Sequence, residues 1–267
     1  MKTQKKILFF DIDGTLLTGA PSFVPESTKL ALKKAREQGH LTFVNTGRTR
    51  YILPKEVQEI GFDGYVCGCG SQIYLHNELV HSSTISHELC VETVKMAEKC
   101  QIAAIFEQSV GLLYNSNVQV SNPEAQRLVS ALSARDISQF DQEEAEHYTF
   151  DKFLVFFQPH SDVETFQNFC EKHFSHFAHD PHVWEITQKE YSKATGIEFL
   201  LKYFDLPLEN SYAFGDSVND LPMLKYAGNS IAMGNAMEEI LPFCHYQTTD
   251  IREDGIYNAM KHFGLLG

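Results

Sequence analysis

The sequence predicts a doubly wound α/β fold, with helices on both faces of a parallel sheet and an inserted α+β domain. Short apolar strand patterns at 6–10 and 41–45 alternate with helical patterns. The same rhythm returns from about 192 to the end of the chain. Between these blocks the order changes, because two strand patterns, 102–107 and 111–115, follow one another directly. Alternation predicts a parallel sheet, and adjacent strands predict an antiparallel one.

Two blocks of the chain supply the expected core, residues 1–80 and 188–267. The first block predicts strands at 6–10, 41–45 and around Val66, and helices at 26–38 and near 50–60. The second predicts helices at 192–204, 219–226 and 254–263, a further short helix, and strands at 211–215, 230–233 and near 244–248. Gly39 gives the first helix a stop signal. The core is therefore expected to be discontinuous in sequence.

Residues 81–187 are expected to form the inserted domain. Helices are predicted at 86–100, 122–134 and 161–174, and strands at 102–107, 111–115, 152–157 and in the stretch up to about 188. Four histidines recur every third residue from 173 to 182, but Asp180-Pro181 should break any helix through them. We interpret this stretch as solvated, with Phe174 and Phe177 buried, and Trp184 as an aromatic residue of the insert's core.

Composition excludes several classes of function. The chain has 267 residues, 43% of them hydrophobic, and a formal net charge of −13, which argues against nucleic-acid binding. The six cysteines are scattered, as expected for reduced thiols in a cytoplasmic protein. The first apolar run is too short for a signal peptide, and no run is long enough to span a membrane. An anionic substrate would need a bound divalent cation to offset the acidic charge.

Two carboxylates follow the first strand, in the segment DIDGT at 11–15. Asp11 and Asp13 are two residues apart, so their side chains should face the same side. Ligands bind parallel sheets beyond the carboxyl ends of the strands, which places both residues at a site, and Gly14 allows a sharp turn. An ordinary turn is the alternative, because Asp and Gly are common turn residues.

Phosphate-binding groups are predicted at two further helix beginnings. In NTGR at 45–48, the Thr46 hydroxyl and the Gly47 N–H could hold a phosphate oxygen. The alternative is that Thr46 only caps the helix. Lys193 begins a predicted helix, where its charge opposes the helix dipole and a phosphate would be a suitable partner. The alternative there is an exposed surface lysine.

A fourth cluster, GDSVND at 215–220, follows the strand SYAFG. Magnesium prefers hard oxygen ligands, so Asp216 could join Asp11 on one ion, with Asp220 and Asn219 as supporting partners. The alternative is a helix cap at Ser217 with Asp220 in the first turn. All four clusters lie at the same expected edge of the sheet, which makes a shared site the better interpretation.

These clusters, in this order, resemble the four motifs of the haloacid dehalogenase superfamily of phosphatases. The insert lies at the cap position of the Cof-type branch, and the ending DIREDGIYNAM is similar to that of the branch. The resemblance covers the whole core. The chain departs from the family pattern at Ala194, where glycine is common, and at CGCGS, residues 67–71, where the family usually has Asn-Gly-Ala.

The resemblance implies a role for each site residue. Asp11 would be the nucleophile and form an aspartyl-phosphate, and Asp13 would act as general acid and then as general base. Mg²⁺ would be held by the carboxylates of Asp11 and Asp216 and by the main-chain carbonyl of Asp13. Thr46 and Lys193 would bind the transferring phosphoryl group. Positioning and charge neutralisation of this kind are what phosphoryl transfer needs.

The implied reaction is hydrolysis of a small phosphorylated metabolite, such as a sugar phosphate, a nucleotide or a phosphorylated cofactor. Two alternatives stay open: a phosphomutase acting on a sugar phosphate, and a catalytically silent phosphate-binding sensor. The intact carboxylates and lysine argue against the sensor. No nucleic-acid or membrane partner is expected, and the sequence leaves both the substrate and the oligomeric state open.

Overall fold

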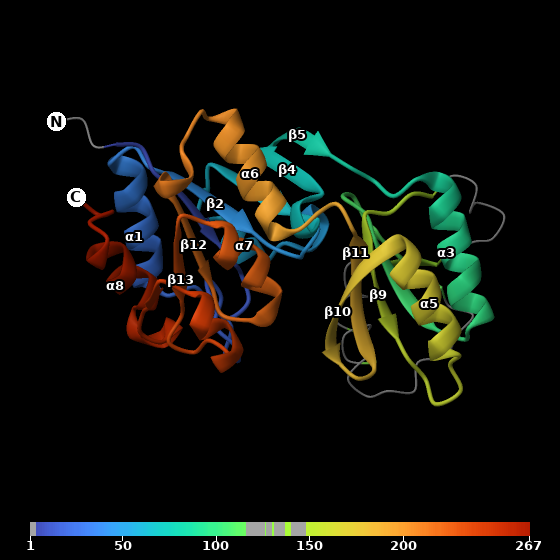
Figure 1. Ribbon diagram of the computed structural model, residues 1–267. Helices are drawn as coiled ribbons and strands as arrows, with labels where there is room; N and C mark the ends of the chain where they lie inside the picture. The colour runs from blue at the N-terminus through green and yellow to red at the C-terminus, as the bar shows by residue number, and fades with distance from the viewer. Residues whose placement is uncertain (1–3, 116–125, 127–129, 131–136, 140–147) are drawn as a thin grey trace. The chain divides into compact units, whose positions relative to one another are not determined.

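The computed structural model describes residues 4–115, 126, 130, 137–139 and 148–267. The chain divides into two compact units (Figure 1). The first, here called the core unit, comprises residues 1–48, 52–82 and 191–267. The second, the insert unit, comprises residues 49–51 and 83–190. Each unit has its own sheet.

An eight-stranded sheet forms the centre of the core unit, in the order β14-β13-β12-β1-β2-β3-β4-β5. Its strands are β1 (Ile7–Phe10), β2 (Leu41–Asn45), β3 (Gly64–Cys67), β4 (Gln72–Leu75), β5 (Glu78–Ser82), β12 (Ser211–Gly215), β13 (Asn229–Ala232) and β14 (Tyr246–Gln247). The six strands from β14 to β3 are parallel, which confirms the predicted sheet. The antiparallel pair β4 and β5 extends this sheet and was not predicted.

Helices cover both faces of this sheet, as the apolar strand β1 requires. Leu8 and Phe10 pack in a cluster with α1 (Glu26–Glu37) and α8 (Gly255–His262). Ile7 and Phe9 point to the opposite face and pack with α6 (Lys193–Tyr203) and α7 (Leu221–Tyr226). Figure 1 shows α1 beside α8, and α6 beside α7. The fold is therefore doubly wound, and β1 is buried on both sides.

The register of β1 determines which chain segments meet at the carboxyl edge of the sheet. Phe10, the last residue of β1, pairs with Phe214 of β12 and with Val44 of β2. The residues that follow these three strands are therefore neighbours in space, although the segments are far apart in sequence. This edge carries the four motif clusters identified in the sequence.

Two predicted helices of the core differ from the structure. The pattern near 50–60 gives a 3₁₀ turn, Arg50–Ile52, and then the single-turn helix α2, Lys55–Gln58. Pro54 separates them, because the residue before a proline avoids the helical region. The pattern at 219–226 likewise divides into a 3₁₀ turn, Val218–Asp220, and α7, which has Pro222 in its first turn.

A six-stranded sheet forms the insert unit, in the order β10-β11-β9-β6-β7-β8. Its elements are α3 (His87–Lys99), β6 (Ala103–Glu107), β7 (Leu112–Tyr114), β8 (Ile137–Gln139), β9 (Lys152–Phe156), α5 (Val163–His173), β10 (Phe174–Asp180) and β11 (Val183–Gln188). All neighbouring strands are antiparallel except β7 and β8. The helix predicted at 122–134 lies outside the described residues, apart from residues 126 and 130.

The histidine-rich stretch is mostly a strand. Helix α5 ends at His173, and the chain continues as β10, which forms an antiparallel hairpin with β11. His176 is exposed and stacks on Trp184 with ring centroids 4.3 Å apart. Phe174 is buried as predicted, whereas Phe177 is only half-buried. Trp184 also packs edge-on against Phe157, which confirms it as an aromatic residue of the insert's core.

Candidate active site

Asp11 is the first residue after β1, and its position is set by the sheet itself. Its backbone N–H donates to the carbonyl of Phe214, 3.1 Å away, which continues the pairing of β1 with β12 by one residue. Its carboxylate lies at the carboxyl edge of the sheet, and the residue is only 5% exposed. A carboxylate in such a place needs a charged or hydrogen-bonding partner, because burial without one is costly.

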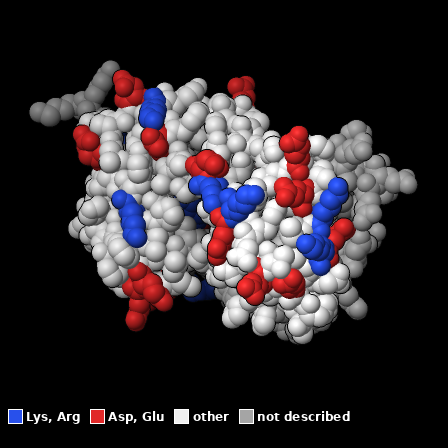
Figure 2. Space-filling model, turned by 45° about the vertical axis from the view of Figure 1, so that its right-hand side comes forward, with Lys and Arg blue, Asp and Glu red and all other residues white. Residues whose placement is uncertain are grey.

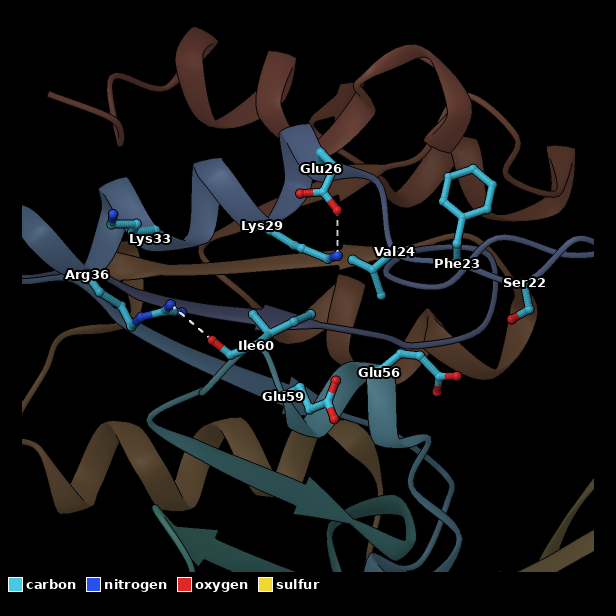
Figure 3. A pocket seen from close by; sticks show the side chains of 10 residues that line it. All are labelled: Ser22, Phe23, Val24, Glu26, Lys29, Lys33, Arg36, Glu56, Glu59 and Ile60. Carbon is cyan, nitrogen blue, oxygen red and sulfur yellow. Dashed lines mark hydrogen bonds and ion pairs between the residues drawn. The ribbon is translucent and has the colours of Figure 1, made fainter.

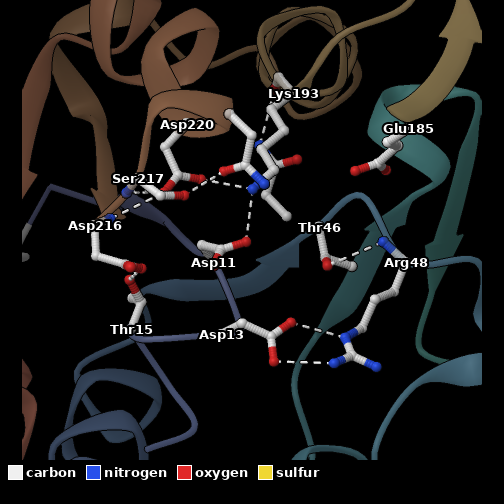
Figure 4. Close-up of polar contacts among 12 residues, drawn as sticks. Asp11, Asp13, Thr15, Thr46, Arg48, Glu185, Lys193, Asp216, Ser217 and Asp220 are labelled. Atoms are coloured by element: carbon white, nitrogen blue, oxygen red, sulfur yellow. Dashed lines mark hydrogen bonds and ion pairs between the residues drawn. The ribbon is translucent and has the colours of Figure 1, made fainter. Parts of the chain in front are cut away.

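Lys193 is that partner. Its Nζ donates to Asp11 Oδ1 at 2.6 Å and to Asp220 Oδ1 at 2.5 Å (Figure 4). It is the first residue of α6, which is fixed by a capping box on Ser192. The side chain is 1% exposed, so the alternative of a surface lysine is wrong. Burial lowers the pKa of Lys193, but the charges of Asp11 and Asp220 raise it more, and the group stays an ammonium ion.

Asp216 and Asp220 lie close together but form different hydrogen bonds. Asp220 Oδ2 accepts from the backbone N–H groups of Asp216, at 2.9 Å, and Ser217, at 3.1 Å, and so shapes the loop after β12. The Thr15 hydroxyl donates to Asp216 Oδ1 at 2.8 Å and orients it. Gly14 has a φ of +89°, and a Cβ there would lie 2.3 Å from Asp216 Oδ2. Only glycine fits at this crossing of the two loops.

The charge of this cluster is out of balance. Oxygen atoms of Asp11, Asp216 and Asp220 lie within 4.8 Å of one another, and the Lys193 ammonium forms ion pairs with two of these carboxylates, Asp11 and Asp220. Burial, and then the charge of Asp220, raise the pKa of Asp11 to about 8 despite Lys193. The same two causes raise the pKa of Asp216 to about 7. A hard divalent cation would relieve this repulsion, and carboxylate oxygens are the ligands that Mg²⁺ prefers. The donor set therefore fits Mg²⁺.

Asp13 is placed differently from Asp11, although the two are close in sequence. Its side chain is 59% exposed and accepts two parallel hydrogen bonds from Arg48, 2.8 Å from Nε and 2.9 Å from Nη2. Figure 4 shows the Asp11 carboxylate directed toward Lys193 and the Asp13 carboxylate directed toward Arg48. Arg48 was not predicted as a site residue. The only local signal was a basic residue directly after Thr46-Gly47.

Thr46 lies in a tight loop after β2 and is buried. Its hydroxyl accepts from the backbone N–H of Arg48 at 3.2 Å, and its carbonyl accepts from that of Cys69 at 3.1 Å. The segment CGCGS thus supports the Thr46-Gly47 loop through its main chain. Gly70 is required there, because a Cβ would lie 2.3 Å from the carbonyl oxygen of Ser192.

Two asparagines complete the surroundings of the cluster. Asn219 accepts from the Ser217 hydroxyl at 2.7 Å, so it shapes the loop of Asp216. Asn45, the last residue of β2, donates from Nδ2 to the carbonyl oxygen of Lys193 at 2.8 Å. This bond joins two motifs 148 residues apart. Asn45 was not predicted, because nothing in the local sequence marks a buried contact with α6.

A hollow of about 630 Å³ in the core unit has no part in this cluster (Figure 3). It is lined by residues 22–24, by one side of α1 and by Glu56, Glu59 and Ile60. Its cations already have partners: Lys29 donates to Glu26 at 2.6 Å, and Arg36 donates to the Ile60 carbonyl at 3.2 Å. None of the predicted site residues lines it.

Charged side chains of both signs are interspersed on the face of the molecule shown in Figure 2. In the part of the chain that the structure describes, no helix combines the length and the hydrophobicity that crossing a lipid bilayer requires.

The cluster combines a buried carboxylate, an ammonium group hydrogen-bonded to it, and a second carboxylate able to share a cation. An aspartate carboxylate is an established nucleophile in phosphoryl transfer. The lysine and a cation would neutralise the oxygens of the transferring group. The arrangement therefore suits phosphoryl transfer to Asp11.

Comparison with known proteins agrees with this chemistry, because several proteins similar to this chain are described as phosphatases. A family model for haloacid dehalogenase-like hydrolases matches residues 8–260. The putative phosphatase YkrA of Bacillus subtilis strain 168 is 26% identical, with 98% of this chain and 99% of that protein covered. The pyridoxal phosphate phosphatase YbhA of Escherichia coli strain K12 is also 26% identical, with 88% and 90% covered. The solved structure of BT4131, described as a sugar phosphatase of HAD subclass IIB, is 29% identical, with 98% and 100% covered and a TM-score of 0.83. The chain belongs to the haloacid dehalogenase-like hydrolase family, as its motifs predicted.

Proposed function

We propose that this protein is a magnesium-dependent phosphatase that hydrolyses a small phosphorylated metabolite through an aspartyl-phosphate on Asp11. One observation carries the proposal. The Asp11 carboxylate is buried at the end of β1, 2.6 Å from the Lys193 ammonium and within 4.8 Å of an Asp216 oxygen. A nucleophile, a phosphate-binding cation and a metal ligand thus converge on one point.

In the first step an oxygen of Asp11 attacks phosphorus, and the bond from phosphorus to the leaving oxygen breaks. Asp13 donates a proton to that oxygen. In the second step Asp13 accepts a proton from a water molecule, whose oxygen attacks phosphorus and releases phosphate and free Asp11. Lys193, the Thr46 hydroxyl and the Gly47 N–H hold the phosphoryl oxygens in both steps.

Asp11, Asp216 and the main-chain carbonyl of Asp13 would hold the Mg²⁺ ion. Bound there, the ion supplies positive charge that offsets the phosphate and the surplus carboxylates. Asp220 and Asn219 support this arrangement through the loop after β12. We expect the ion to bind better as the pH rises, because its carboxylate ligands must be ionised.

The substrate is expected to be a sugar phosphate, a nucleotide or a phosphorylated cofactor. The similarity to a sugar phosphatase and to a pyridoxal phosphate phosphatase supports this range. We assign catalysis to residues 1–80 and 188–267, and the choice of substrate to the insert, 81–187. An inserted domain can act as a lid that excludes water during the reaction. We expect a cytoplasmic enzyme, where such metabolites occur.

The test is a screen of phosphorylated metabolites for release of inorganic phosphate, with Mg²⁺ and with excess chelator. We expect release that requires the metal, and none from Asp11→Asn. An isomerised sugar phosphate without free phosphate would support the phosphomutase. Binding of phosphorylated compounds without any turnover would support the sensor. Turnover that survives complete removal of metal would contradict the proposal.

A further inference from the structure

The side chain of Asn45 joins the two phosphate-binding motifs of the core unit. It is the last residue of β2, directly before Thr46, and it is completely buried. Its Nδ2 donates to the main-chain carbonyl of Lys193 at 2.8 Å. We propose that Asn45 is a positioning residue for Lys193: it fixes the start of α6 against the end of β2 so that the Lys193 ammonium meets the transferring phosphoryl group. The inference rests on the proposed function.

Lys193 is thereby held at both ends. Its ammonium lies between Asp11, at 2.6 Å, and Asp220, at 2.5 Å. Those bonds orient the tip of a long flexible side chain, but they do not fix the backbone from which it extends. The capping box on Ser192 orders this backbone within α6, and Asn45 adds a bond that holds it against the end of β2. With both ends fixed, little rotational freedom is lost when the phosphoryl group binds, which is the benefit of a preorganised site.

The packing around this bond is tight. A Cβ on Gly196 would lie 2.3 Å from Val66 Cγ1, so the first turn of α6 rests directly on β3. A Cβ on Gly70 would lie 2.3 Å from the Ser192 carbonyl oxygen. The beginning of α6 therefore contacts both the sheet and the loop that supports Thr46. In such a junction a small change at Asn45 is transmitted to Lys193, because packed elements do not deform freely.

The amide oxygen of Asn45, Oδ1, indicates that this residue contributes little to the stability of the fold. Its Oδ1 is buried and has no hydrogen-bond partner within the described part of the chain. A buried acceptor without a partner costs folding free energy, which offsets the gain from the bond to Lys193. An apolar residue of the same shape would remove both the bond to Lys193 and the cost of the unpartnered oxygen. Asn45→Leu should therefore leave stability almost unchanged while releasing the Lys193 backbone.

The chain offers a matched control in Asn210. It is also a buried asparagine in the core unit with a long-range bond, since its Oδ1 accepts from Lys6 Nζ at 2.7 Å. It precedes β12 and so lies at the amino end of that strand, whereas Asp216 follows the carboxyl end. Asn210→Leu loses a comparable contact away from the proposed chemistry.

The experiment compares wild type, Asn45→Leu, Asn45→Ala and Asn210→Leu, each with Mg²⁺ and one substrate from the screen. We expect Asn45→Leu to lower kcat by roughly 10- to 100-fold, the scale of a misplacement of about 1 Å. Its melting temperature should stay within roughly 4 °C of wild type. Asn45→Ala should lower kcat similarly and serves if the leucine does not fit. Asn210→Leu should lower the melting temperature and leave kcat unchanged.

Two further measurements separate positioning from general damage. Inhibition by orthovanadate, which mimics five-coordinate phosphorus, should weaken in Asn45→Leu by about the same factor as kcat/KM, and inhibition by inorganic phosphate should weaken less. In a Lys193→Met background, Asn45→Leu should have no further effect, because both changes act through the same ammonium group.

The outcomes distinguish the inference from the function on which it rests. Wild-type turnover by Lys193→Met would refute the proposed role of that lysine. If Lys193→Met is impaired but Asn45→Leu is not, the inference about Asn45 fails and the phosphatase proposal stands. An Asn45→Leu effect that persists in Lys193→Met, or that follows the melting temperature alone, also overturns the inference.

Discussion

Each unit of the molecule buries a lysine between two carboxylates. In the core unit, Lys193 lies between Asp11 and Asp220. In the insert unit, Lys152 of β9 forms ion pairs with Glu107 of β6, at 3.5 Å, and with Glu185 of β11. Burial raises the pKa of Glu107, as it does that of Asp11. The two clusters are alike in composition and in burial.

The clusters differ in what surrounds them. The core cluster lies beyond the ends of parallel strands and has another carboxylate, Asp216, close enough to share a cation. The insert cluster lies on the strands themselves, where Glu107 and Lys152 are opposite each other in register. Among the described residues, only the core cluster groups three potential metal ligands. The two clusters therefore differ in the surplus carboxylate, Asp216, which lies at a strand end beside the core lysine and its two partners.

The largest effect is expected from removing the nucleophile. Asp11→Asn should reduce turnover by at least about 10⁴-fold, because no other described group is placed to form the covalent intermediate. The fold should persist, because the change removes a carboxyl group whose ionised form is disfavoured in the folded protein, as its raised pKa indicates. Phosphate release and far-UV circular dichroism check the two statements. Full turnover by Asp11→Asn, or phosphate found covalently on another residue, contradicts the mechanism.

A smaller and selective loss is expected for Asp13→Asn. It keeps the nucleophile and the main-chain carbonyl but removes the acid and base, a loss of roughly 10²–10⁴-fold. Alkyl phosphates, with poor leaving groups, should suffer most. An activated aryl phosphate should still phosphorylate Asp11, and the adduct should accumulate because no base activates water. Intact mass after rapid quenching measures it, with Asp11→Asn as the control that should carry no adduct.

Replacing the two lysines tests the comparison directly. Lys152→Met leaves two buried carboxylates in the insert without their cation, which should cost about 3–5 kcal/mol in the free energy of unfolding. Turnover of a small aryl phosphate should change little in the protein that remains folded. Lys193→Met should instead abolish most turnover. If Lys152→Met impairs the chemistry of a small substrate as strongly, the two clusters do not differ in the way described.

The smallest effect concerns metal and pH. The pKa values of Asp11, about 8, and Asp216, about 7, lie above the ordinary value of 3.8. At pH values between the ordinary pKa and the raised ones, the folded protein binds more protons than the unfolded chain. Without metal, its stability should therefore fall as the pH rises through this range. Mg²⁺ binds the ionised carboxylates, and at about 100 times its Kd would add about 2.7 kcal/mol.

Thermal unfolding with and without Mg²⁺ at about pH 5.5 and about pH 8 measures this difference. The melting temperature should rise more on adding Mg²⁺ at the higher pH. In Asp216→Asn the stabilisation by Mg²⁺ should be much weaker at both values. An equal rise at both values in wild type would show that these carboxylates do not bind the ion.

Much of the architecture could be predicted because its causes are local. The apolar strands that end at Phe10 and at Gly215 are buried on both faces, and short-range turn chemistry follows each. Parallel strands place such ends at one edge of the sheet, so the meeting of Asp11 with Asp216 followed from pattern alone. The errors also have local causes, since Pro54 divides the helix predicted near 50–60.

The sequence by itself thus determined the doubly wound core and the residue types gathered at its carboxyl edge. Only the tertiary structure decided their pairing. It placed Lys193 between Asp11 and Asp220, turned Asp13 toward Arg48, and joined Asn45 to the Lys193 backbone across 148 residues. No periodicity or fixed spacing in the sequence predicts such contacts. They depend on how closely α6 packs on the sheet, which is a property of the whole fold.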